Sequence, residues 1–162
     1  MQEEIRQHVI RARGEVALED LSQVETVTEA DTVYHIDRIS EEAILSWFEA
    51  NWPAELSTVL VMEGLSDADR MVFPRTTPAE QARFICIVDP IDGTRGLMYD
   101  KRSAWVLAGV APNRGSESNL SDIEVAVMTE LPTSKQRLAD QMSAVRGAGI
   151  AGVRSELSLI HI

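Results

Sequence analysis

Two aspartates three residues apart, Asp89 and Asp92, directly follow a short apolar run. The run, F-I-C-I-V at 84–88, is rich in β-branched residues and is bounded by turn residues, which is typical of a buried strand. Pro90 cannot donate to a sheet ladder and Gly93 permits a tight turn, so pairing is predicted to stop here. Carboxylate oxygens on such a turn suit a hard cation such as Mg²⁺, which usually joins a few carboxylates to a phosphate.

Thr94 extends this pattern, because threonine is a favourable N-cap, the residue that directly precedes the first turn of a helix. Backbone N–H groups at a helix start suit a phosphate group. An isolated D-P-x-D-G string is as compatible with an ordinary acidic turn as with a metal and phosphate site. The complete string after an apolar run favours the site.

The string D-P-I-D-G-T that begins at Asp89 resembles the signature of the inositol monophosphatase family, within the superfamily that includes fructose-1,6-bisphosphatase. The resemblance implies a Mg²⁺-dependent hydrolase that cleaves an inositol phosphate or a related sugar phosphate by attack of metal-activated water. It also implies that Asp89, Asp92 and the carbonyl group of Ile91 bind metal. The implied phosphate-binding residues are Ile91, Asp92, Gly93 and Thr94.

A second part of the resemblance concerns Asp37. Alone, an acid near a helix start is explained by its favourable interaction with the helix dipole. However, the segment A-D-T-V-Y-H-I-D that ends at Asp37 is similar to the family segment before its long helix. The resemblance implies that Asp37 acts with Thr94 to polarise the attacking water.

A third part concerns Glu63, which follows the apolar run S-T-V-L-V-M at 57–62. Alone, this carboxylate is most simply interpreted as facing solvent. The family has a G-E-E segment in this place, and the resemblance implies that Glu63 matches its first glutamate, binds metal and assists catalysis. Met62 and Gly64 replace the neighbouring family residues, so the contacts that orient this ligand are expected to differ.

The segment after the motif, R-G-L-M-Y-D-K-R at 95–102, departs from the family pattern of a polar residue, asparagine and aromatic residues. Two interpretations of Arg95 remain open. It could contact an anionic substrate, or it could pair with Asp100 on the surface, which the sequence slightly favours.

The elements that must position these residues are predicted from hydrophobic periodicity. Helices are expected at 1–13 and 29–51, and the segment 14–27 is interpreted as helix or loop. Strands are expected at 57–62, 84–88, 103–111, 123–131 and 142–146, with a polar connection at 66–83 and a glycine-rich turn at 147–152. This order predicts an α+β fold with a mixed or largely antiparallel sheet. The resemblance narrows it to the first lobe of a layered αβαβα sugar-phosphatase sandwich.

Composition narrows the function classes. The 162 residues suffice for one domain with a core, and the 44% hydrophobic content is that of an ordinary globular protein. A net charge of −11 argues against nucleic acid or an anionic membrane as partner. It is compatible with a small phosphorylated substrate if metal ions cover a group of carboxylates. The single cysteine fits a reducing compartment, so the expected location is cytoplasmic.

The resemblance covers most of residues 26–152, whereas family members are longer and carry a later W-D-x-A-A-G-like segment whose aspartate completes the metal site. We therefore interpret residues 1–154 as an N-terminal lobe and residues 155–162 as a tail that matches nothing in the family, in a truncated chain. The alternative function is a non-catalytic metal- or phosphate-binding fragment. An exposed inner sheet surface would favour a homodimer or aggregation. An acidic module that binds a protein partner is disfavoured by the co-occurrence of Asp37, Glu63 and the motif.

Overall fold

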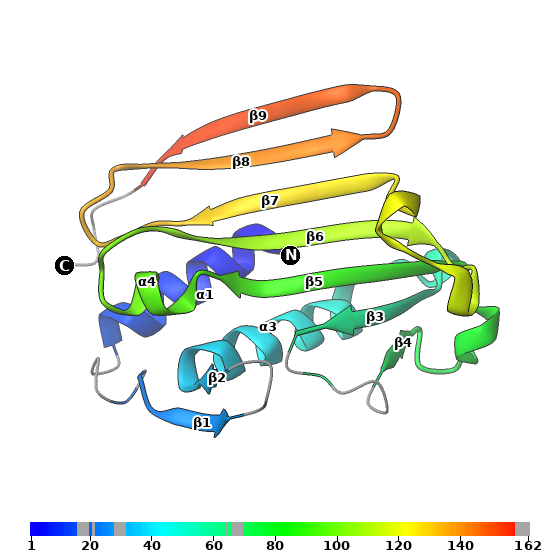
Figure 1. Cartoon of the computed structure of the whole chain (residues 1–162), viewed down its shortest axis with the longest axis horizontal. Helices are drawn as coiled ribbons and strands as arrows, with labels where there is room; N and C mark the ends of the chain where they lie inside the picture. Colours follow the sequence, from blue (N-terminus) through cyan, green and yellow to red (C-terminus); the bar gives the residue numbers. More distant parts are fainter. Residues whose placement is uncertain (16–19, 21, 28–31, 64, 66–69, 158–162) are drawn as a thin grey trace.

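The computed structural model describes residues 1–15, 20, 22–27, 32–63, 65 and 70–157. In this part of the chain the main element is a seven-stranded sheet with strand order β4-β3-β5-β6-β7-β8-β9 (Figure 1). The strands are β3 Thr58–Met62, β4 Met71–Phe73, β5 Phe84–Asp92, β6 Ala104–Pro112, β7 Val125–Leu131, β8 Leu138–Val145 and β9 Gly149–Glu156. Within this sheet β3 and β5 pair in parallel and the other neighbours pair antiparallel. The predicted α+β class with a mixed, largely antiparallel sheet is confirmed.

Two helices, α1 (Gln2–Glu15) and α3 (His35–Asn51), cover one face of this sheet (Figure 1). Their amphipathic stripes decide which side faces the sheet, because apolar residues at helical spacing bury together. Ile5 of α1 and Ile44 of α3 are almost completely buried. A short third helix, α4 (Thr94–Met98), follows the motif strand. In the described part of the chain, no helix is long and apolar enough to cross a membrane.

The core lies between these helices and the strands that they cover. In β5, Cys86 and Val88 alternate with outward-facing residues and are each 1% exposed. Burial raises the pKa of the Cys86 thiol to about 12. Cys86 is therefore a small apolar core residue, as a cysteine in the middle of a buried strand usually is.

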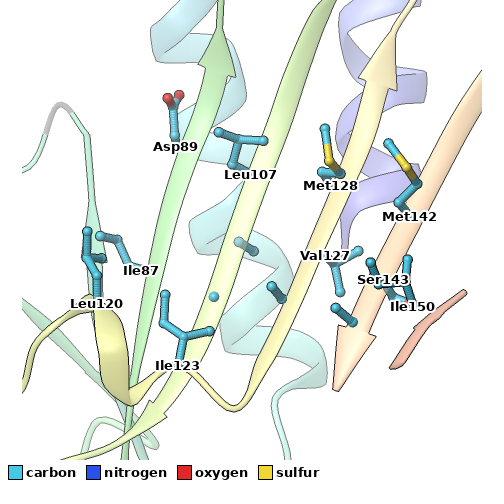
Figure 2. Close-up of a pocket in the computed structure, with 14 residues that line it drawn as sticks. Ile87, Asp89, Leu107, Leu120, Ile123, Val127, Met128, Met142, Ser143 and Ile150 are labelled. Atoms are coloured by element: carbon cyan, nitrogen blue, oxygen red, sulfur yellow. The ribbon is translucent and has the colours of Figure 1, made fainter. Parts of the chain in front are cut away.

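The opposite face of the sheet is open and apolar (Figure 2). Register places Asp89, Leu107, Met128 and Met142 in one cross-strand row from β5 to β8. The row lies in a hollow of about 470 Å³, and Asp89 stands at its end. Ile150 of β9 contributes a further exposed apolar side chain. The expected homodimer, which would use such a surface, stays a prediction.

Several predicted boundaries are wrong for local reasons. The second helix begins at His35 rather than near residue 29, because Thr32–Tyr34 forms strand β2. The segment interpreted as helix or loop contains strand β1, Val24–Val27, which pairs antiparallel with β2. Residues 16–19, 21 and 28–31 of these two predictions lie outside the described residues.

Besides β1 and β2, two further strands were not expected. The segment 66–83, predicted to be only a polar connection, contains the three-residue strand β4. The predicted glycine-rich turn overlaps strand β9, which pairs with β8 along its whole length. Strand β9 also includes the first two residues of the segment interpreted as a tail. The end of that segment, 158–162, lies outside the described residues.

The buried β3 side chains should dominate stability. Leu60 is 0% exposed, so Leu60→Ala should lower the free energy of unfolding by about 2–5 kcal/mol, through lost burial and the cavity left behind. The same substitution at Leu120, which is 72% exposed, should change it by less than about 0.5 kcal/mol. Urea denaturation of both variants tests this, and equal losses would contradict the assigned core.

Candidate active site

The candidate site lies where the two parallel strands end. The register pairs Met62 of β3 with Val88 of β5, and the N–H of Glu63 donates to the carbonyl of Val88 at 3.2 Å. Parallel strands present their carboxyl ends at the same edge of a sheet. The parallel pairing therefore brings the backbones of Glu63 and Asp89 to neighbouring places on that edge.

The motif turn begins with an irregularity in β5. Its ladder with β6 shifts register between Asp89 and Asp92. The backbone N–H of Ile91 donates to Oδ1 of Asp89 at 3.1 Å, which orients this carboxylate beside the turn. Gly93 then adopts the left-handed conformation with φ 100° and is the N-cap of α4, which starts at Thr94. The predicted cap at Thr94 is therefore wrong by one residue. A glycine is favoured here because a side chain is strained at such an angle.

Thr94 and Asp37, 57 positions apart in the sequence, meet at the start of α4. The Thr94 hydroxyl lies 2.9 Å from Oδ1 of Asp37 and 2.9 Å from the carbonyl oxygen of Ile91. Oδ2 of Asp37 accepts from the backbone N–H of Tyr34 at 2.8 Å. The carboxylate is thus fixed at the N-terminus of α3, and one of its oxygens accepts from the threonine.

The three acidic side chains predicted to bind metal differ in exposure. Asp89 is half-buried, whereas Glu63 and Asp92 are exposed. Their oxygen atoms and the carbonyl of Ile91 are the donor types that Mg²⁺ prefers. However, no group of three or more His, Cys, Asp or Glu side chains in the described residues is arranged to hold a metal ion. The donor chemistry and the shared sheet edge fit magnesium, but a pre-assembled three-carboxylate cluster is not found in that part.

Comparisons with known proteins place this arrangement in a known fold. The sequence matches no family profile, and no curated protein matches it. Solved structures do match: the extragenic suppressor protein SuhB of Bartonella henselae (TM-score 0.65, 22% identity), fructose-1,6-bisphosphatase of Leishmania major (0.64, 14%) and an IMPase of Thermotoga maritima (0.59, 17%). Each match covers 93% of this chain and between 45% and 48% of the other.

The fold is that of solved structures that include an IMPase and a fructose-1,6-bisphosphatase. This chain spans about half the length of the superfamily structures that it matches. The match agrees with the resemblance that the motif carries, although the identities show the fold alone. The roles predicted for individual site residues stay predictions.

The structure also shows a set of contacts around Asp100, called here the Asp100 tether, that the sequence analysis did not predict. Asp100, just after α4, accepts hydrogen bonds from Arg13 of α1 at 2.7 Å and from the backbone N–H and hydroxyl of Ser134, each at 2.7 Å. Lys135 lies 3.6 Å from the same carboxylate. The expected surface pair between Arg95 and Asp100 is therefore wrong, because Arg13 and the β7–β8 connection occupy this carboxylate. No spacing rule indicates contacts between residues so distant in the sequence.

This tether changes the electrostatics of Asp100. Partial burial acts to raise the pKa of this carboxyl, but the hydrogen bonds from Ser134 and the contact with Arg13 outweigh it and hold the pKa well below its usual range. Asp100 also has a left-handed backbone, with φ 52°, which is uncommon for a residue other than glycine. Its contacts therefore fix the turn that ends α4.

Gly93 should be intolerant of a side chain for a conformational reason. A Cβ there would have ordinary contacts, at 3.6 Å from Cβ of Ala104, so Gly93→Ala should cost about 1–2 kcal/mol through backbone strain alone. Gly14→Ala, at a helical position with nothing near the added Cβ, should instead stabilise by up to about 1 kcal/mol. Thermal unfolding of the two variants should shift in opposite directions, and a neutral Gly93→Ala would contradict the assigned turn.

Asp100→Asn should destabilise the protein in a pH-dependent way. The lowered pKa means that ionised Asp100 stabilises the folded state above the unfolded pKa, near 4, and that this contribution is lost as pH falls through the folded pKa. Urea denaturation at pH 7 should show a loss of about 1–3 kcal/mol. The difference from the parent should shrink below about pH 4. The exposed control Glu80→Gln should show little change at either pH.

Proposed function

We propose that this chain carries the phosphate-binding and water-activating half of a Mg²⁺-dependent phosphate monoester hydrolase of the inositol monophosphatase type. Its substrate would be an inositol phosphate or a related sugar phosphate. The observation that carries the proposal is the hydrogen bond between Thr94 and Asp37, next to the turn that bears Asp89 and Asp92. The superfamily fold supports it.

Thr94 and Asp37 would orient the attacking water. A threonine hydroxyl has one proton, so when Thr94 donates to Asp37 its oxygen remains free to accept a hydrogen bond from water. Of the two acceptors within reach of this proton, the Asp37 carboxylate would be favoured over the Ile91 carbonyl, because hydrogen bonds to a charged acceptor are stronger. The pair would draw the water proton toward the threonine and point the water lone pair at phosphorus.

Glu63, Asp89, the carbonyl of Ile91 and Asp92 would hold Mg²⁺. A bound magnesium ion supplies a lowered pKa for its water and neutralises charge that builds up on the phosphoryl group. The chain would contribute to metal binding through its sheet edge, because β3 and β5 end there side by side. Two ionised carboxylates on adjacent strands repel one another, and this repulsion favours binding of a divalent cation between them.

The phosphate would lie over the start of α4. The first N–H groups of a helix have no partners within the helix, so those of Gly93 and Thr94, at the start of α4, would donate to the phosphate. Asp92, which is exposed beside them, would contact the substrate as well as the metal. Substrate binding would thus use backbone donors together with Asp92, whereas Glu63 and Asp89 would bind the metal alone.

A non-catalytic metal- or phosphate-binding fragment is the second candidate. One observation favours it: the described residues contain no pre-assembled three-carboxylate group. In this case the motif would still bind ligands, but the chain would release no phosphate.

The decisive variant is Thr94→Val, which keeps the shape of the side chain and removes its hydroxyl. Phosphate release from inositol and sugar monophosphates, with and without Mg²⁺, should be magnesium-dependent in the parent chain. It should fall by about 100-fold or more in Thr94→Val, because the water loses its acceptor. Thr94→Ser should retain most of it. The exposed threonine Thr76 offers a matched control, since Thr76→Val removes the same hydroxyl elsewhere.

If Thr94→Val and the parent chain release phosphate equally, the proposed role of the threonine is wrong. If neither releases phosphate, calorimetric titration with Mg²⁺ and inorganic phosphate distinguishes the two candidates. Binding that Asp89→Asn weakens would support the fragment, and absence of binding would reject both.

A further inference from the structure

The two edges of the seven-stranded sheet are protected unequally. One edge is β4, which has three residues and is followed directly by Pro74. The other edge is β9, which has eight residues and contains no proline. Short strands and proline are devices that keep the edge of a sheet from pairing with another chain. Within the described residues, no strand pairs with the outer side of β9, so this edge offers a row of backbone donors and acceptors.

Strand β9 is also regular. Its ladder with β8 pairs every residue from Gly149 to Glu156 without a register shift. A bulge, which would twist the edge away from a new partner, is therefore absent from the ladder between β8 and β9. Eight residues of strand extend over roughly 26 Å. This length and regularity suit the addition of one more strand by an extended segment of another chain.

Apolar side chains are exposed on both faces of β9. Ile150 is 81% exposed and Val153 is 63% exposed. They are three positions apart in a strand, so they lie on opposite faces of the sheet. The helices α1 and α3 pack against β5, β6 and β7, and β9 lies at the rim of the sheet beyond them (Figure 1). An added strand would contact both side chains, and these cross-strand contacts would supplement its backbone hydrogen bonds.

The hairpin of β8 and β9 differs in charge from the rest of this acidic protein. Residues 135–157 contain four cations and two anions, whereas the whole chain has a net charge of −11. The charged residues of this segment are Lys135, Arg137, Asp140, Arg146, Arg154 and Glu156. At physiological ionic strength the screening length is about 8 Å, so a ligand that lies along β9 interacts mainly with these nearby charges. The edge of the sheet is therefore locally cationic.

The cations gather at the end of β9. A hollow of about 500 Å³ there is lined by Lys135, Arg137 and Arg154, together with Glu130 and Asp140. Both acids are engaged: Asp140 accepts two hydrogen bonds from Arg154, at 2.6 and 2.8 Å, and Glu130 accepts from the backbone N–H of Asp140 at 3.0 Å. In the part of the chain that the structure describes, the exposed guanidinium of Arg137 has no such partner. Its planar fork is suited to a carboxylate.

We infer that β9 is a docking edge for an extended acidic segment of a partner protein. The segment adds a strand to β9, and one of its carboxylates binds Arg137 in the hollow at the end of that strand. A second copy of this chain is a less suitable occupant, because edge-to-edge pairing would bring together two hairpins that each carry an excess of cations. The inference is independent of the proposed hydrolysis and adds a protein partner to it.

The test is binding of a synthetic peptide to the intact chain, measured by fluorescence anisotropy. The labelled peptide has ten residues, with valine and threonine in its centre and two glutamates at each end. An analogue with glutamine in place of glutamate keeps the strand and should bind about tenfold more weakly. A second analogue carries N-methyl groups on two adjacent central residues, which removes one donor from each edge of the peptide. It should also bind about tenfold more weakly, because ladder hydrogen bonds are lost.

Variants of the chain locate the contact. Arg137→Gln should lower the affinity for the glutamate peptide by about threefold, and Arg137→Lys, which keeps the charge and loses the fork, by less. The exposed Arg75 follows β4 at the other edge of the sheet, so Arg75→Gln is a matched control that should leave the affinity unchanged. Saturating peptide should slow hydrogen exchange of the β9 amides and leave those of β4 unchanged.

Absence of peptide binding would overturn the inference. Equal affinity for the glutamine analogue would show that acidic chemistry is not recognised, and equal affinity for the N-methylated analogue would exclude strand addition. Sedimentation of the chain without peptide tests the competing occupant. Self-association that protects the β9 amides as protein concentration rises would assign this edge to a second copy and would reject the acidic segment.

Discussion

The parallel pairing of β3 with β5 is the constraint on which the candidate site depends. The other neighbours in the seven-stranded sheet run antiparallel, so their ends alternate between its two edges. In a parallel pair, the residue that follows one strand lies beside the last residues of the neighbouring strand. In an antiparallel pair it does not. The hydrogen bond from the N–H of Glu63 to the carbonyl of Val88 is part of this pairing. The backbones of Glu63 and Asp89 thereby lie at neighbouring places on one edge of the sheet.

The short helix α4 is stabilised by contacts at its two ends, because it is too short to be stable alone. Five residues are too few to be stable as an isolated helix. A left-handed residue precedes it at Gly93 and another follows it at Asp100. The first turn aims Thr94 at Asp37, and the second is fixed by Arg13 and Ser134. The position of the threonine therefore depends on elements as distant as α1 and the β7–β8 connection.

The sequence predicted those parts of the structure that have a local cause. The apolar run before Asp89 predicted β5, and the helical stripe predicted most of α3. The meeting of Thr94 with Asp37 could be expected only from the family resemblance, because no local pattern joins residues 57 positions apart. Strand β9 could not be predicted, since its glycine-rich sequence is typical of a turn and only pairing with β8 extends it. The tether at Asp100 likewise depends on three separate segments that only the folded chain brings together.

The burial of Cys86 has a practical consequence for the motif strand. It is the only cysteine of the chain, it lies three residues before Asp89, and it is 1% exposed. A thiol with a pKa near 12 is almost entirely protonated at neutral pH, and its packing excludes alkylating reagents. Its modification therefore requires that β5 separate from the core. The unmodified protein thus contains its own chemical reporter of strand opening, and the labelling rate measures how often the sheet under the candidate site comes apart.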